Sequence, residues 1–166
     1  QTAFRDGHIH GSINLMDGGK FETWLGSVVG PDEQFYLIAE SAEKVEILIR
    51  KAAKIGYESR IKGALTTPPQ LIETLEEVDV DDVRSMSDAY TIVDIRNTGE
   101  TATRRIFPGA LEIPLPELRE RVAEIPSDKP ILVHCAGGYR SAAGASIIQP
   151  LVNVPVYDLG EAILTF

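Results

Sequence analysis

The sequence predicts an α/β fold made of two similar domains, each with a mainly parallel sheet flanked by helices. Short apolar runs alternate with segments of helical periodicity, which is typical of strands joined by crossover helices. The two halves also align over two segments, residues 7–14 with 105–112 and 35–39 with 131–135, which indicates an internal repeat. Hydrophobic residues make up 43% and charged residues 25% of the chain, an ordinary composition for a folded protein.

The first half begins with a polar, turn-like stretch at residues 4–11 and a short apolar segment at 12–15. Residues 21–25 can form one helical turn, which the proline at position 31 ends. Residues 35–39 form a continuous apolar run. This run predicts a buried strand.

A helix follows that strand at once, which indicates a βα unit. Ser41 is suited to cap the helix N-terminus, the apolar face continues to Lys54, and Gly56 marks the end. Residues 57–61 are a weaker candidate for a strand.

An acidic segment separates the two halves. The proline pair at 68–69 can open a helix that continues through Leu75. Residues 73–82 contain six acidic residues and no basic residue, so we expect a surface helix end or connector there. The predicted organisation is a first domain over residues 1–70, an acidic connector over 71–87 and a second domain over 88–166.

The second half repeats the alternation of strands and helices. Its apolar runs predict strands at residues 91–96, 110–114, 131–134 and 154–159. Segments with helical spacing predict helices at residues 115–125 and 141–148.

Composition and charge exclude several classes of function. The net charge is -9, and the acidic excess lies mainly after residue 70, which argues against a nucleic-acid partner. No apolar run approaches the roughly 20 residues of a membrane span, and no signal segment opens the chain, so we expect a cytoplasmic protein. His8 and His10 lack a set of further ligands, so neither a metal nor a cofactor is expected.

Cys135 is the one cysteine of the chain, so it cannot form an internal disulfide. It lies at the carboxyl end of a predicted strand, where ligands bind in open α/β sheets. Gly137 and Gly138 allow the backbone N–H groups of residues 136–141 to point inward and form an anion-binding nest. Such surroundings can lower a cysteine pKa from roughly 8.5 to roughly 3.5–7.5, which favours the nucleophilic thiolate.

Arg140 closes the same loop and offers a planar cationic group for an oxyanion on a substrate. We therefore predict Cys135 and Arg140 as catalytic residues. The predicted substrate-binding residues are Ala136, Gly137, Gly138, Tyr139 and Ser141.

Three motifs of the second half resemble those of the rhodanese family of sulfurtransferases. Residues 94–96 resemble its Asp-x-Arg strand end, residues 107–110 its His-Ile-Pro-Gly-Ala turn, and residues 135–140 its active-site loop. The resemblance implies that Cys135 attacks a sulfane sulfur, holds it as a persulfide and passes it to an acceptor. The implied donor is thiosulfate or a low-molecular-weight persulfide, and the acceptor is a thiol or cyanide. Asp94 and Arg96 are expected to form an internal ion pair that supports the loop.

The first half resembles a rhodanese-like domain that is degenerate or N-terminally truncated. Ala39 occupies the cysteine position, and residues 40–44 replace the glycine-bearing nest with two carboxylates, so this half cannot carry sulfur in the same way. Residues 21–26 and 55–57 resemble the inactive middle domain of proteins that fuse a metallo-β-lactamase-fold persulfide dioxygenase to tandem rhodanese domains. A further domain N-terminal to this chain is therefore expected. Residues 160–163 depart from the family pattern, which leaves donor specificity open.

Two other functions fit parts of this pattern. A cysteine phosphatase uses a similar strand, cysteine, amide loop and arginine, but it has five residues between cysteine and arginine, whereas four separate Cys135 from Arg140. A non-catalytic binding module is the second alternative, in which Cys135 is a relic. The intact loop after Cys135 argues against it.

Overall fold

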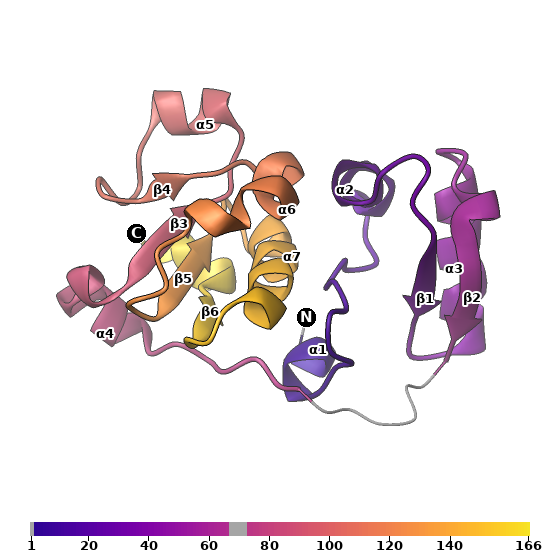
Figure 1. Ribbon diagram of the computed structural model, residues 1–166, viewed down its shortest axis with the longest axis horizontal. Coiled ribbons are helices and arrows are strands. Elements are labelled where there is room, and N and C mark those ends of the chain that lie inside the picture. Colours follow the sequence, from indigo (N-terminus) through magenta and orange to yellow (C-terminus); the bar gives the residue numbers. More distant parts are fainter. Residues whose placement is uncertain (1, 67–72) are drawn as a thin grey trace.

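The computed structural model describes residues 2–66 and 73–166 and confirms the α/β class (Figure 1). Within these ranges the named strands form two sheets, and every strand pair in them is parallel. The two-stranded sheet contains β1 (Phe35–Ile38) and β2 (Ile61–Leu65). The four-stranded sheet has the order β4-β3-β5-β6, with β3 at Thr91–Asp94, β4 at Leu111–Glu112, β5 at Ile131–His134 and β6 at Val156–Asp158.

In the first half, α3 (Ala42–Ala53) connects β1 to β2, as the predicted βα unit requires. The Ser41 hydroxyl oxygen accepts a hydrogen bond from the Lys44 N–H at 3.2 Å, which confirms the predicted cap. Gly56 has a φ of 76°, a left-handed conformation that ends the helix. Two further helices precede β1: α1 (Thr2–Asp6) and α2 (Phe21–Val28).

Several sequence-based predictions for the first half were wrong. The β1 strand is not buried: Leu37 is, but Tyr36 is 60% and Ile38 37% exposed, because a helix of this unit covers one face of so small a sheet. The strand predicted at residues 57–61 lies instead at Ile61–Leu65, so the two ranges share only Ile61. The Tyr57 side chain is buried and its hydroxyl donates to the Val29 carbonyl at 2.8 Å, which holds a 3₁₀ turn (Glu58–Arg60) ahead of β2.

Other predictions differ in position or lie outside the described residues. The helix α1 begins before the turn-like stretch at 4–11 and extends into it as far as Asp6. The helix predicted from the proline pair at 68–69 falls on residues that the structure does not describe, and Leu75 beyond it is buried outside any helix. The acidic connector leads into α4 (Val80–Ser85), whose N-cap Asp79 accepts from the Asp81 N–H at 2.9 Å.

In the second half, β5 has the predicted bounds, and α7 (Tyr139–Ile148) begins two residues before the predicted start. The helix predicted at 115–125 is divided into a 3₁₀ turn (Leu115–Glu117), α6 (Leu118–Arg121) and a second 3₁₀ turn (Val122–Glu124). The proline at 126 disfavours helical backbone at the residue before it, so the chain tightens instead of continuing as an α-helix. The remaining elements are a 3₁₀ turn at Ser87–Ala89, α5 (Thr98–Thr103), a 3₁₀ turn at Gln149–Leu151 and a 3₁₀ helix at Gly160–Thr165.

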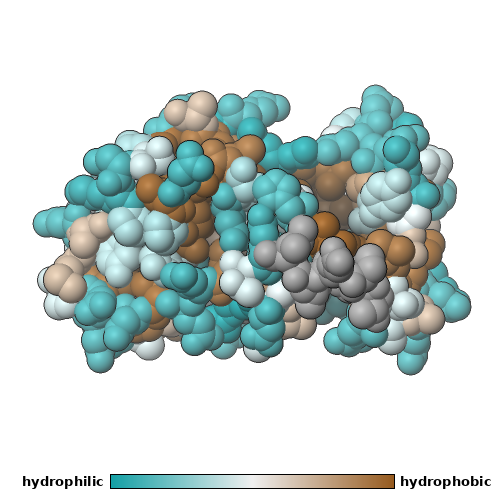
Figure 2. Space-filling view, turned by 60° about the horizontal axis from the view of Figure 1, so that its bottom comes forward, coloured by the Kyte–Doolittle hydropathy of each residue, from teal (hydrophilic) through white to brown (hydrophobic). Residues whose placement is uncertain are grey.

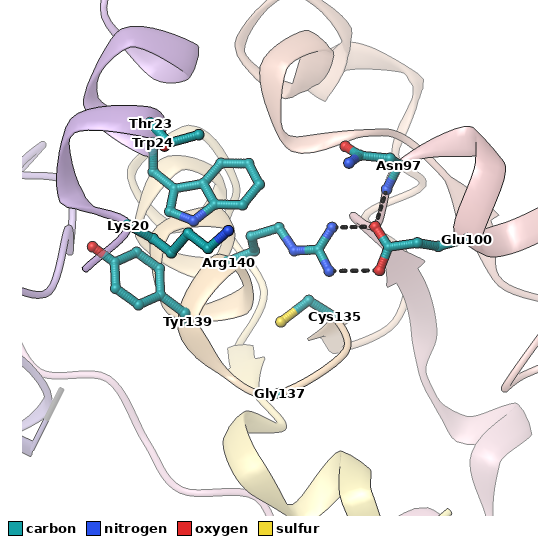
Figure 3. Close-up of a pocket in the computed structure, with 9 residues that line it drawn as sticks. All are labelled: Lys20, Thr23, Trp24, Asn97, Glu100, Cys135, Gly137, Tyr139 and Arg140. Atoms are coloured by element: carbon teal, nitrogen blue, oxygen red, sulfur yellow. Dashed lines mark hydrogen bonds and ion pairs between the residues drawn. The ribbon is translucent and has the colours of Figure 1, made fainter. Parts of the chain in front are cut away.

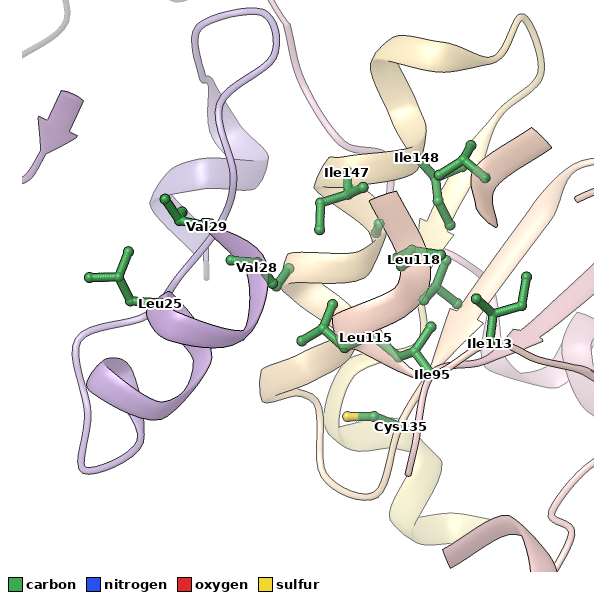
Figure 4. Packing of buried hydrophobic residues seen from close by; sticks show 14 of the residues in the cluster. Leu25, Val28, Val29, Ile95, Ile113, Leu115, Leu118, Cys135, Ile147 and Ile148 are labelled. Carbon is green, nitrogen blue, oxygen red and sulfur yellow. The ribbon is translucent and has the colours of Figure 1, made fainter. Parts of the chain in front are cut away.

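One hydrophobic cluster extends through both halves. The helices α6 and α7 lie on the side of the four-stranded sheet that faces the first half, and α2 lies between them and the two-stranded sheet (Figure 1). Val28 of α2 is directed toward Leu115 and Ile147 of the second half (Figure 4). This contact brings the turn before α2 close to the carboxyl end of β5.

Polar contacts join the same two halves. The Asn14 N–H donates to the Ser146 hydroxyl on α7 at 2.9 Å. Arg119 donates to both carboxylate oxygens of Glu33, at 2.6 and 2.8 Å, and to the Val28 carbonyl at 2.7 Å. The halves therefore pack as one body through α2, α6 and α7.

The units β1-α3-β2 and β5-α7-β6 have the same connectivity, a strand, a helix and a parallel neighbouring strand. The predicted repeat rests on this correspondence and on the sequence alignment, and it stays a prediction, as do the domain boundaries at 70 and 88. Among residues 2–66 and 73–166, no helix is long and apolar enough to cross a membrane.

Candidate active site

Cys135 follows directly on β5, which lies between β3 and β6 in the sheet. Its side chain is 2% exposed and forms part of the wall of a cavity of about 460 Å³. The cavity opens where the carboxyl ends of the parallel strands meet the first half (Figure 3). A single thiol is thus held at the inner end of an open pocket.

The loop after Cys135 depends on a left-handed glycine. Gly138 has a φ of 90°, and a Cβ there would lie 2.9 Å from the backbone of Gly160 and Glu161. In this conformation the Gly138 N–H donates to the Cys135 Sγ at 3.2 Å. The Ser141 hydroxyl oxygen lies 3.7 Å from the same sulfur. The sulfur therefore has two polar neighbours in the loop, one of which is a backbone N–H. The predicted nest of several inward N–H groups stays a prediction.

Arg140 is paired with a carboxylate that the sequence analysis did not identify. Its guanidinium donates to both oxygens of Glu100, at 2.6 and 2.8 Å, and lies over the Trp24 ring with the guanidinium carbon 5.4 Å from the ring centre. One Glu100 oxygen also accepts from the Asn97 N–H at 3.1 Å (Figure 3). The anion-anchoring role predicted for Arg140 stays a prediction, because its charge is already balanced.

The Arg140–Glu100 pair shifts the pKa of both groups. Arg140 holds the pKa of the Glu100 carboxyl below its usual value. Glu100 in turn raises the pKa of Arg140. Both groups are therefore ionised throughout the neutral range.

The first half supplies one side of the cavity. Tyr139 follows the left-handed glycine, and its hydroxyl donates to the Met16 carbonyl in the turn before α2. Burial raises the pKa of Tyr139 to about 12, with smaller contributions from Asp17 and Glu22, so this hydroxyl stays a neutral donor. The cavity is lined by Lys20, Thr23, Trp24, Asn97, Glu100, Cys135, Gly137, Tyr139 and Arg140.

Asp94 and Arg96 form the predicted ion pair at the end of β3. The Arg96 Nη2 donates to the Asp94 Oδ2 at 2.6 Å, and both side chains are buried. The Arg96 backbone N–H and Nε also donate to Asp94, and its Nη2 reaches the Arg104 carbonyl at 2.8 Å. Asp94 raises the pKa of Arg96. The pair thus fixes the backbone at the carboxyl end of β3, the strand that neighbours β5.

His134 precedes Cys135 and is completely buried. Neither ring nitrogen has a hydrogen-bond partner among the described residues, and Nε2 lies 3.7 Å from the Asp94 Oδ2. The ring meets the Phe107 ring edge-on, with 5.1 Å between centres. Burial lowers the pKa of His134 in spite of the nearby Asp94 charge, so the ring is neutral.

The two histidines of the first half have structural contacts. His8 stacks on Phe4 and bonds its carbonyl through Nδ1 at 2.8 Å, while His10 pairs with Glu73. Within the described ranges, no group of three or more potential ligands is close enough to hold a metal ion.

The structure brings together most of the predicted site residues and adds others. Cys135, Gly137, Tyr139 and Arg140 line the cavity, and Gly138 and Ser141 contact the sulfur. Ala136 is exposed and does not line it. Glu100 and Asn97 were not predicted as site residues, although Asn-x-x-Glu is a helix-capping pattern. Lys20 and Thr23 were not predicted either, because they belong to no such pattern in the sequence.

A comparison with protein-family models matches the part of the chain that contains Cys135. Residues 79–161 match the family model described as rhodanese-like domain. An HTH-type transcriptional regulator of Mycobacterium tuberculosis is 43% identical over 49 residues, which cover 30% of this chain and 21% of the regulator. The uncharacterized protein YqhL of Bacillus subtilis is 32% identical over 68 residues, 41% of this chain and 53% of that protein. The matches thus span about a fifth and about half of these relatives.

A solved structure is also similar to part of the chain. The rhodanese-related protein from Thermoplasma volcanium is 28% identical, with a TM-score of 0.47, and the match covers 54% of this chain and 91% of that one.

Proposed function

The chain belongs to the rhodanese-like domain family, and from this premise we propose that it is a sulfurtransferase with Cys135 as its nucleophile. The observation that carries the proposal is the position of this thiol, at the inner end of an open cavity with the Gly138 N–H directed at its sulfur. A backbone N–H in this place stabilises negative charge on sulfur, both in the thiolate and in a persulfide.

In the first step, the Cys135 thiolate attacks the outer sulfur of a donor such as thiosulfate. A bond forms between the two sulfurs, the sulfur–sulfur bond of the donor breaks, and sulfite leaves with the electron pair. In the second step, a thiolate or cyanide attacks the outer sulfur of the persulfide, and the Cys135 thiolate leaves with the electron pair. The two steps transfer one sulfur atom and need no oxidant or cofactor.

Arg140 stabilises negative charge on Cys135 in this proposal, and Glu100 orients Arg140. Support comes from the bidentate contact with Glu100, which holds the guanidinium at the cavity that Cys135 also lines. The buried pair of Asp94 and Arg96 fixes the adjacent strand end and does not react.

We also propose that the first half is a rhodanese-derived domain without a nucleophile. Ala39 stands where Cys135 stands in the second half, and the units β1-α3-β2 and β5-α7-β6 have the same connectivity. The likeness of residues 21–26 and 55–57 to a fusion protein supports a metallo-β-lactamase-fold partner domain, and the free thiol suits a reducing cytoplasm.

Turnover with thiosulfate and cyanide tests the proposal. The wild-type protein should form thiocyanate, and Cys135→Ser should reduce the rate to that of the uncatalysed reaction. A phosphate ester offered to the same sample should not be hydrolysed. Equal thiocyanate formation by the wild type and Cys135→Ser would remove the basis for the enzyme assignment and favour a binding module.

A further inference from the structure

Most cations near the cavity already have an anionic partner. Arg140 is paired with Glu100, Lys44 and Lys51 with Asp17, and Lys54 with Glu22. The ammonium group of Lys20 has no ion pair or hydrogen bond within residues 2–66 and 73–166. The unbalanced positive charge at this cavity therefore comes from the first half of the chain.

Lys20 is held at the cavity by the turn that precedes α2. The Tyr139 hydroxyl of the Cys135 loop donates to the Met16 carbonyl, and the Lys51 ammonium donates to the Gly18 carbonyl at 3.1 Å. Figure 3 shows the Lys20 side chain beside Tyr139, with its nitrogen directed into the pocket. The contacts of this turn thus fix the lysine on the side of the cavity opposite Glu100.

We infer that Lys20 binds the anionic end of the sulfur donor, so that the half without a nucleophile determines which donor Cys135 uses. This inference rests on the proposed sulfur transfer. The donor class consists of sulfane-sulfur compounds with an anionic leaving group, either the sulfonate end of thiosulfate or a persulfide that carries carboxylates.

The position of Lys20 suits the way in which a donor must enter the cavity. The sulfur that Cys135 attacks must reach the buried inner end of the cavity, so the leaving group points toward the opening. Lys20 and Thr23 lie on that side, and Lys20 is exposed and free to follow the anion. Because the charges of Arg140 and Glu100 cancel, Lys20 supplies the positive charge among the residues that line the cavity.

The test measures the rate of sulfur loading on Cys135 by intact mass at increasing donor concentration. It uses thiosulfate and, separately, glutathione persulfide. For at least one donor, Lys20→Gln should raise the half-saturating donor concentration about fivefold, which is the loss of affinity expected when a partly exposed charge contact is removed. The maximal loading rate should stay nearly unchanged. Lys20→Arg should restore most of the wild-type value. Lys62→Gln, on β2 and outside the cavity lining, is the matched control and should behave as the wild type.

The outcomes separate this inference from the proposal on which it rests. If Lys20→Gln raises the half-saturating concentration more for thiosulfate, the donor is of the sulfonate type. If it raises that concentration more for glutathione persulfide, the donor carries carboxylates. If Lys20→Gln loads with the wild-type half-saturating concentration for both donors, the inference is wrong while the sulfurtransferase assignment stands. If the wild type loads no sulfur from either donor, the assignment itself fails.

Discussion

At the scale of single residues, the Cys135 loop depends on two adjacent glycines with different surroundings. Gly138 has a φ of 90°, and a Cβ there would meet the backbone of Gly160 and Glu161 at 2.9 Å. A Cβ at Gly137 would meet no atom within 4 Å. The left-handed glycine therefore holds the loop in the shape that directs an N–H at the sulfur.

Gly138→Ala should lower the free energy of unfolding by about 1–3 kcal/mol, because it adds backbone strain and a contact with rigid backbone. Gly137→Ala is the matched control and should change stability by less than about 0.5 kcal/mol. Urea denaturation of both variants measures the difference. Equal losses in the two variants would show that the loop does not need the left-handed conformation.

His134 gives the stability of the protein a dependence on pH. Burial lowers its pKa in the folded state, whereas the unfolded chain takes up a proton below about pH 6.5. The unfolded state then binds more protons, so the free energy of unfolding should fall as the pH falls through this range.

Between pH 7.5 and 5.5 the wild type should lose up to about 1 kcal/mol more stability than His134→Gln, which lacks the titrating ring. Urea denaturation at pH 7.5 and at pH 5.5 gives the loss of unfolding free energy for each protein. Comparing the two losses removes the destabilisation that the substitution itself causes at both pH values. Parallel losses in the two proteins would mean that the ring also ionises in the folded state.

At the scale of elements, the carboxyl end of β3 is fixed by a buried ion pair. Asp94 accepts the backbone N–H and the side chain of Arg96, and Arg96 also reaches the Arg104 carbonyl. β3 pairs with β5 from Thr91 opposite Ile131 to Asp94 opposite His134. A substitution in the ion pair therefore acts on the strand that Cys135 follows.

Asp94→Asn should destabilise the fold by about 3 kcal/mol, because it leaves the Arg96 guanidinium buried without a balancing charge. Asp88→Asn, an exposed site in the same half, serves as the control and should have little effect. Chemical denaturation followed by circular dichroism gives both values. A loss below about 1 kcal/mol at Asp94 would contradict a supporting role for the pair.

The sequence predicted the elements whose pattern is local. The bounds of β5 and the Ser41 cap of α3 follow from neighbouring residues, so they could be predicted. The exposed face of β1 could not, because it depends on which neighbours cover the strand. The 3₁₀ turn at Glu58–Arg60 likewise depends on the distant Val29 carbonyl.

The same distinction holds for the candidate site. The loop from Cys135 to Ser141 is continuous in the chain, so its residues could be identified together. Glu100, Trp24 and Lys20 join it only through the packing of α5 and α2 against the loop. The residues of the loop were therefore predictable, and the charged side chains around it were not.

At the scale of the whole molecule, the two halves share one hydrophobic cluster and hydrogen bonds such as Arg119 to Glu33. We therefore expect them to unfold in one transition. Trp24 is the one tryptophan of the chain and reports on the first half, whereas far-ultraviolet circular dichroism reports on the whole chain. The two probes should give the same midpoint in urea. Two separate midpoints would mean that the halves are independent domains and that the cavity between them is not built into the fold.

The proposed persulfide on Cys135 can be measured by intact mass spectrometry. After incubation with thiosulfate and removal of excess donor, the wild-type protein should gain about 32 Da, the mass of one sulfur atom, and lose it again when cyanide is added. Cys135→Ser should gain no mass. A wild-type protein that stays at its original mass with every sulfane-sulfur donor, while folded and with its thiol reduced, would contradict the account.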